Sequence, residues 1–161
     1  MKTWIRRLTL SSTLAVAALA AGASTAESPR APLPPAYVVE CGSCHVAFPG
    51  RMLAAASWRA VVAGLDQHFG VDASVDPKTR EAIAAFLAST ARSKPTTANG
   101  IPLLRITETR WFRQEHDEVP GRFWKEPNAV KAANCAACHR GAAQGSYSER
   151  SLRLPKQGEA K

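Results

Sequence analysis

The chain has 161 residues, of which 45% are hydrophobic, and a formal net charge of +8. This length allows one domain or two very small ones. The positive charge by itself would suit a nucleic-acid binder, but no basic run is interleaved with aromatic residues, so the composition argues against nucleic-acid recognition.

Residues 1–26 have the pattern of a secretory signal peptide. A basic start with Lys2, Arg6 and Arg7 precedes a short apolar run, Leu14 to Ala21, and small residues that suit cleavage. The alternative is an N-terminal membrane anchor, but eight apolar residues fall far short of the ~20 that span a bilayer. The sequence therefore predicts an exported, soluble mature protein located in the periplasm.

Residues 27–93 are expected to form a first lobe. A proline-rich leader and a short helix enter the stretch Cys41-Gly42-Ser43-Cys44-His45. Its C-x-x-C-H spacing is the signature of covalent c-type haem attachment. The two thiols, Cys41 and Cys44, would each add across a vinyl group of one porphyrin, and His45 would then lie under the iron as an axial ligand.

Helices are expected in the rest of this lobe. Ser57 is a candidate N-cap for a helix whose apolar residues recur at helical spacing as far as Phe69. Asp76 and Pro77 form a good N-cap and first-turn pair for a second helix, which ends near Thr90. Residues 94–102 contain prolines, threonines and a glycine and are interpreted as a linker between lobes.

Residues 103–161 are expected to form a second, smaller haem lobe with a polar tail. A helix over about 109–119 would place Phe112 and His116 on one face. A short, alanine-rich helix over 128–137 would lead into the second motif, and the tail from Gly141 is expected to have weak structure. The stretch Cys135-Ala136-Ala137-Cys138-His139 repeats the attachment motif, with Cys138 next to His139. All of the long elements expected are helices, so the sequence predicts a mainly α fold with two small haem lobes and two covalently bound haem c groups.

Other chemistries use paired cysteines as well. A C-x-x-C pair can be a zinc half-site, a redox dithiol or a disulfide, and the two pairs together could form a four-thiolate zinc site. Such a zinc site has no need of a histidine directly after both pairs, and only four residues of the chain are histidine. The motif interpretation therefore favours two haems.

Few residues of the chain could supply the second axial ligand of each iron. Outside the motifs the histidines are His68 and His116, and Met52 is the only methionine after the signal segment. A lone histidine on an apolar face is ordinarily a hydrogen-bonded core residue, but here two irons need ligands and each half holds one spare histidine. Each spare histidine also stands 23 positions from its motif histidine. We therefore predict His45 with His68 and His116 with His139, with Met52 as apolar packing.

Two histidines on each iron would leave no open position for a substrate and would give low reduction potentials, because the thioether that raises the potential is absent. The predicted chemistry is electron transfer. Residues 96–161 hold 11 basic and seven acidic side chains, and this excess is either a solvated surface or a docking face for an acidic partner.

Stretches spread along the chain match a known family. They are Cys41 to His45 with Phe48-Pro49, Ser57-Trp58, His68 to Gly70 with Asp72 to Ser74, Arg105 to Thr107, Trp111-Phe112 with Glu115-His116, and Asn134 to His139. Together they resemble the soluble dihaem cytochromes c of purple and other proteobacteria. The resemblance covers most of residues 37–139 and implies a first lobe like a class I cytochrome c and a second lobe of its own type. It also implies two histidines on each iron and electron donation to an oxygen-binding monohaem cytochrome in the periplasm. A quinol-linked or b-type membrane cytochrome is the expected kind of donor.

Two other functions remain as alternatives to an electron carrier. A small dihaem peroxidase or reductase, or a gas-binding haem protein, would need one iron with an open or displaceable ligand. Either would regain support if His68 or His116 were only a core residue.

Overall fold

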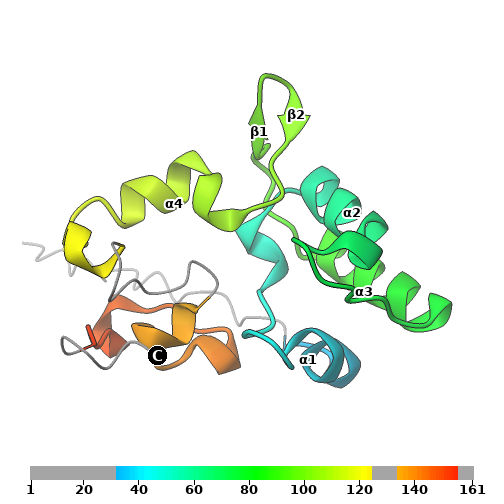
Figure 1. Cartoon of the computed structure of the whole chain (residues 1–161), viewed down its shortest axis with the longest axis horizontal. Helices are drawn as coiled ribbons and strands as arrows, with labels where there is room; N and C mark the ends of the chain where they lie inside the picture. The colour runs from blue at the N-terminus through cyan, green and yellow to red at the C-terminus, as the bar shows by residue number, and fades with distance from the viewer. Residues whose placement is uncertain (1–31, 125–133, 156–161) are drawn as a thin grey trace, which may run out of the picture. The chain divides into compact units, whose positions relative to one another are not determined.

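The computed structural model describes residues 32–124 and 134–155, and all of these belong to one compact unit. Its helices are α1 (Pro35–Cys41), α2 (Ala55–Ala63), α3 (Pro77–Ser89) and α4 (Arg110–Glu115), joined by short 3₁₀ turns (Figure 1). Two short strands, β1 (Thr97–Ala98) and β2 (Ile101–Pro102), form the regular sheet. The mainly α prediction is confirmed, whereas the predicted signal peptide lies outside the described residues.

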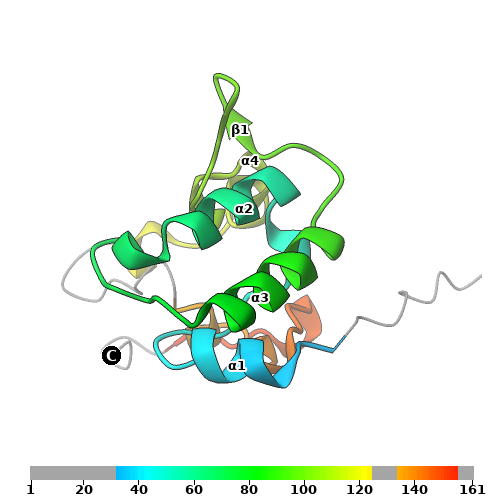
Figure 2. The same ribbon diagram turned by 90° about the vertical axis from the view of Figure 1, so that its right-hand side faces the viewer.

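The core lies among the first three helices. Helix α2 packs against α3, and α1 also contacts α3 (Figure 2). Trp111 and Tyr147, from the second half of the chain, pack against the same core. Met52 is only 6% exposed, as expected for apolar packing. The division into two lobes stays a prediction. The buried apolar residues are Tyr37, Ala47, Met52, Leu53, Trp58, Val62, Leu65, Ile83 and Leu87.

Helix α3 begins as the sequence predicts. The Asp76 carboxylate accepts hydrogen bonds from the backbone amides of Lys78 and Thr79, at 3.0 and 3.1 Å, and Pro77 occupies the first helical position. These two bonds satisfy amides that have no partner inside the helix. The helix ends at Ser89, close to the predicted end.

The prediction for the start of α2 is wrong. Ala54, not Ser57, is the N-cap, and Ser57 lies inside the helix with its side chain fully buried. The Ser57 hydroxyl donates to the carbonyl oxygen of Thr96 at 3.1 Å. Serine at this position therefore serves a tertiary contact rather than a helix cap.

Residues 94–102, interpreted as a linker, contain the β-hairpin. Strands β1 and β2 pair antiparallel, with Thr97 opposite Pro102. Asn99 and Gly100 form the turn with φ of 51° and 79°, and an Asn-Gly pair with two positive φ angles is the preferred two-residue hairpin turn. Thr96, directly before the hairpin, is 5% exposed, so this segment is anchored to the core.

Helix α4 is shorter than predicted. It ends at Glu115 because the His116 backbone, with φ of −122° and ψ of 13°, leaves the helical region. The tail beyond Gly141 was expected to have weak structure, yet it forms 3₁₀ turns at Ala142–Gln144 and Glu149–Ser151, and Ala142 is fully buried. The predicted helix over 128–137 falls mostly outside the described residues. No helix among the described residues is long and apolar enough to cross a membrane.

Candidate haem sites

The first cysteine motif starts at the C-terminal end of α1. Cys41 is the last helical residue, and the amide of Gly42 donates to the carbonyl of Val38 at 2.9 Å. A Cβ at Gly42 would collide with that same carbonyl oxygen, so a side chain between Cys41 and Ser43 would force the backbone to shift. The end of the helix thus determines the backbone path through the motif.

The motif histidine is held in one tautomer and one orientation. His45 Nδ1 lies 2.8 Å from the carbonyl oxygen of Val46, to which it donates a hydrogen bond. This bond leaves Nε2 free to bind a metal. The Phe48 ring stacks on the imidazole with centroids 4.6 Å apart, and the Phe48 carbonyl accepts the Tyr37 hydroxyl at 2.8 Å. Helix α1 therefore braces the segment that carries His45.

The second motif forms a 3₁₀ turn over Cys135–Ala137. The amide of His139 donates to the carbonyl of Cys135 at 2.8 Å, and the amide of Arg153 donates to the carbonyl of Cys138 at 2.9 Å. The returning tail thus holds the second motif in place. His139 Nδ1 is buried without a hydrogen-bond partner among the described residues, and the Tyr147 ring lies 5.2 Å from the imidazole centroid.

His68 follows a 3₁₀ turn over Leu65–Gln67, after α2 has ended at Ala63. Its ring centroid lies 6.3 Å from that of His45, with 31° between the ring planes. Burial lowers the pKa of His68, and the nearby His45 lowers it further. The neutral imidazole, which is the form that binds metals, is favoured at this position.

His116 caps the C-terminal end of α4. Its Nδ1 lies 2.8 Å from the carbonyl oxygen of Phe112, and the two rings stack with centroids 3.9 Å apart, so the predicted shared face is confirmed. The His116 ring centroid lies 6.0 Å from that of His139, with 68° between the planes. Burial lowers the pKa of His139, with a further contribution from His116.

The two separations fit a metal between each pair of rings. Metal–imidazole bonds are about 2 Å long, and the bonding nitrogen lies roughly 1 Å from its ring centre, so two imidazoles on opposite sides of one metal have centroids about 6 Å apart. Both pairs match this spacing, and the structure brings each spare histidine to the motif histidine expected from the sequence.

Large apolar side chains are exposed beside the paired rings. Phe69 and Val71, which follow His68, are 45% and 58% exposed, and Trp124 is 42% exposed with its ring 6.3 Å from that of His116. Burying such side chains under an apolar group is favourable. A porphyrin face is such a group, so the surroundings fit a haem at each pair.

The surroundings of three cysteines disfavour the thiolate form. Burial raises the pKa of the thiols of Cys41 and Cys138, and raises that of Cys135 to about 11. Zinc ligands and redox dithiols need thiolates, whose formation is favoured by a lowered pKa, whereas a thioether sulfur carries no charge. All four cysteines lie within the described residues and none is in a disulfide. Nor do the described residues contain a cluster of three or more His, Cys, Asp or Glu suited to a metal ion.

These features define a c-type cytochrome: two C-x-x-C-H motifs, each facing a further histidine at the spacing of two axial ligands. The family model for dihaem cytochrome c matches residues 37–147, which include both motifs. The chain belongs to this family, an electron-transfer family, and its cofactors are two covalently bound haem c groups.

Solved structures agree with this assignment. The dihaem cytochrome c sb-DHC of Shewanella baltica OS155 is 34% identical, with a TM-score of 0.65, and the match covers 80% of this chain and 100% of that one. Two structures from Rhodobacter sphaeroides, DHC and a dihaem cytochrome c, are 40% and 38% identical, with TM-scores of 0.59 and 0.62; each match covers 71% of this chain and 96% of theirs. No curated protein sequence matches the chain.

Sequence reasoning missed several residues that contact the histidines. Phe48 stacks on His45, and Phe69 lies edge-on to His68 with centroids 4.8 Å apart. Arg105 lies over Phe69, and Tyr147 packs beside His139. Helical periodicity had placed Phe69 in the apolar stripe of a helix. The signals available for the two phenylalanines were their positions one to three residues after a histidine. Arg105 stood in one of the stretches that carry the family resemblance, but nothing there indicated its contact with Phe69, and Tyr147 had no sequence signal.

Proposed function

We propose that this protein is a periplasmic carrier of single electrons in which each iron is bound by two histidines. His45 and His68 bind the first iron, and His116 and His139 bind the second. Both haems then have low reduction potentials, because histidine replaces the methionine thioether that raises the potential of other cytochromes c.

The observation that carries this proposal is the spacing of the ring pairs, 6.3 and 6.0 Å between centroids. Two histidines, His45 and His116, also have Nδ1 committed to a backbone carbonyl, which directs Nε2 to the metal. Iron with two protein ligands has no position for a substrate, which favours a carrier over a peroxidase, a reductase or a gas-binding protein.

Haem c, when bound, supplies a one-electron couple between ferric and ferrous iron. The protein's part is to keep each iron in the same surroundings in both oxidation states. Phe48 and Phe112 stack on His45 and His116 and restrict rotation of these two imidazoles. Fixed ligands that move little on reduction suit fast electron exchange.

The periplasmic location rests on the predicted signal peptide and on the chemistry of the cofactor, because c-type haem is attached outside the cytoplasm. The proposed acceptor is another periplasmic cytochrome, in particular an oxygen-binding monohaem cytochrome c. The proposed donor is a quinol-linked or b-type membrane cytochrome. The 11 basic and seven acidic residues of 96–161 support docking to an acidic face, where charge mainly raises the rate of encounter.

The test is carbon monoxide binding to the dithionite-reduced protein, followed by absorbance. The wild-type spectrum is expected to be that of low-spin haem and unchanged by the gas. Replacing His68 or His116 by alanine should open one iron, so that about half of the haem binds carbon monoxide. Met52→Leu is the control, because the Met52 thioether is the alternative axial ligand considered in the sequence. This variant should behave as the wild type. A wild-type protein that binds the gas at one haem would contradict the proposal.

A further inference from the structure

The residue after His68 has an unusual backbone conformation. Phe69 has φ of 51° and is followed by Gly70 with φ of 99°. A positive φ is uncommon for a bulky residue, and it persists only where surrounding contacts hold it. The turn does place the Phe69 ring against the His68 imidazole, edge to face, with centroids 4.8 Å apart. The conformation of Phe69 is thus directly tied to the orientation of His68.

The contact that holds this ring comes from another part of the chain. The guanidinium carbon of Arg105 lies 4.0 Å from the centroid of the Phe69 ring, within the range of a cation–π interaction. Arg105 lies between β2 and the 3₁₀ turn Ile106–Glu108. The Phe69 ring therefore contacts two groups, the imidazole of His68 edge to face and the guanidinium of Arg105.

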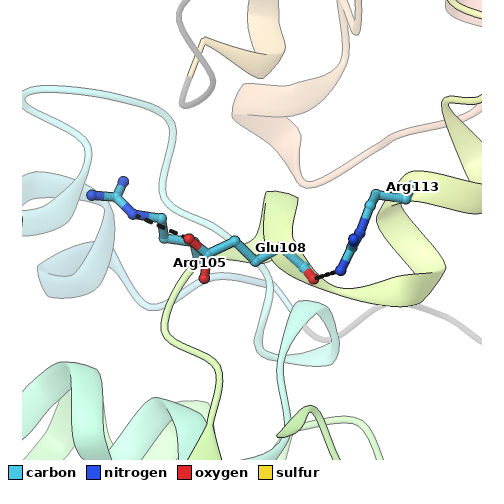
Figure 3. A network of polar contacts seen from close by, with 3 residues as sticks. All are labelled: Arg105, Glu108 and Arg113. Carbon is cyan, nitrogen blue, oxygen red and sulfur yellow. Dashed lines mark hydrogen bonds and ion pairs between the residues drawn. The ribbon is translucent and has the colours of Figure 1, made fainter. Parts of the chain in front are cut away.

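Arg105 is itself held by its neighbours. Its Nε lies 3.7 Å from Oε1 of Glu108, and the backbone carbonyl of Glu108 accepts a hydrogen bond from Nη2 of Arg113 at 2.7 Å (Figure 3). Arg113 belongs to α4, and His116 caps the end of that helix. Glu108 thus connects Arg105 to α4, the helix whose C-terminal end is capped by His116.

We infer that Arg105 is a positioning residue for His68 at the first iron. It acts through Phe69: the cation holds the ring, and the ring holds the strained turn that directs the imidazole. This inference rests on the proposed function, in which His68 is an axial ligand. Without Arg105 the turn relaxes more often, and an external ligand displaces His68 more readily.

The experiment measures cyanide binding to the oxidised holoprotein, because cyanide displaces an axial histidine at sufficient concentration. A cation–π contact at an exposed site corresponds to about two- to fivefold in an equilibrium constant. Arg105→Leu should therefore raise the apparent cyanide affinity about two- to fivefold at one haem per chain and leave the other haem unchanged. Electron paramagnetic resonance identifies the affected haem, since the two ring pairs differ in the angle between their planes.

Three further variants separate this mechanism from a general loss of structure. Phe69→Leu should give the same increase, and the double variant Phe69→Leu/Arg105→Leu should give no more than either change alone. Arg105→Lys keeps a cation near the Phe69 ring and should therefore raise the cyanide affinity less than Arg105→Leu does. Arg59→Leu removes an exposed arginine from α2 and should match the wild type.

The possible outcomes are distinct. Carbon monoxide binding by the wild-type protein would refute the ligation of the irons by two histidines. If the wild-type protein does not bind carbon monoxide and Arg105→Leu leaves the cyanide affinity unchanged, the role of Arg105 is overturned. The ligation of the irons by two histidines is then unaffected. Fully additive effects of Phe69→Leu and Arg105→Leu would overturn the action of Arg105 through Phe69.

Discussion

Replacing Ser57 by alanine tests whether residues 94–102 are anchored to the core. The Ser57 hydroxyl donates to the carbonyl of Thr96 at 3.1 Å and lies 2.8 Å from Thr96 Oγ1. Since serine has one hydroxyl proton, Thr96 must donate in the second bond. Thr96 Oγ1 also accepts from the amide of Ala54 at 3.0 Å. These groups, from three residues, form a polar cluster between α2 and the segment before the hairpin.

The structure gives the size of the expected effect. After Ser57→Ala, the Thr96 carbonyl keeps its bond from the amide of Leu103, at 2.8 Å, but the buried Thr96 hydroxyl loses its acceptor. An unsatisfied buried donor costs about 1–3 kcal/mol. The free energy of unfolding should fall by that amount. Thr96→Val should cost a similar amount because it leaves the Ala54 amide without a partner, and the two costs should not add, since the groups belong to one cluster.

Guanidinium unfolding of the oxidised holoprotein, followed by circular dichroism and by haem absorbance, measures this loss as a shift in midpoint at constant slope. Ser89→Ala is the control, because Ser89 is exposed on α3 and its hydroxyl donates to the carbonyl of Phe86 at 2.9 Å. Surface changes of this kind stay within about 0.5 kcal/mol. If Ser57→Ala costs no more than Ser89→Ala, residues 94–102 act as an unanchored linker and the reasoning is refuted.

Three further predictions concern the ligands, the first motif and a helix cap. The ring planes of His45 and His68 differ by 31° and those of His116 and His139 by 68°. If these pairs bind the irons as proposed, the oxidised protein should show a rhombic low-spin resonance from the first haem and a large-gmax resonance from the second. Two identical signals would contradict these angles. Gly42→Ala places a Cβ against the Val38 carbonyl, and the overpacking should lower the free energy of unfolding by about 1–3 kcal/mol. The fraction of chains that carry two haems, measured by mass spectrometry, should also fall. Full haem loading with unchanged stability would contradict this prediction. Hydrogen bonding by Thr79 lowers the pKa of Asp76 below its ordinary value near 3.8, so its stabilisation is present above the unfolded-state pKa and is lost as pH falls through the folded-state value. Asp76→Asn should keep the cap but weaken the loss of stability on acidification below about pH 4, measured by thermal unfolding against pH; an unchanged pH profile would show that other groups govern it.

The chemistry of attachment could be predicted without a fold. Both motifs consist of five consecutive residues, and the spacing of their cysteines and histidine is a local property of the chain. The Asp76–Pro77 helix start was predicted for the same reason, because a cap depends on residues two and three positions away. The shared face of Phe112 and His116 followed from four-residue spacing.

Other predictions failed where a distant residue decided the outcome. Ser57 has the right type for a helix cap, but Thr96 makes it a buried hydrogen-bond donor. Phe69 continues a helical apolar pattern, but α2 ends at Ala63, and the turn after His68 leaves its ring exposed under Arg105. The hairpin at Asn99-Gly100 had a sequence signal that was not used, and the role of residues 94–102 as a linker between lobes stays a prediction.

The sequence by itself determined the family, the two covalent haem c groups and the mainly α fold, because these depend on short motifs and local periodicity. Equal spacing also suggested which histidines pair. Only the tertiary structure decided how the rings face one another, 6.3 and 6.0 Å apart at different angles, and which residues hold them. Those contacts join segments far apart in the chain, and their geometry depends on how turns and helices pack around the core, which no local pattern encodes.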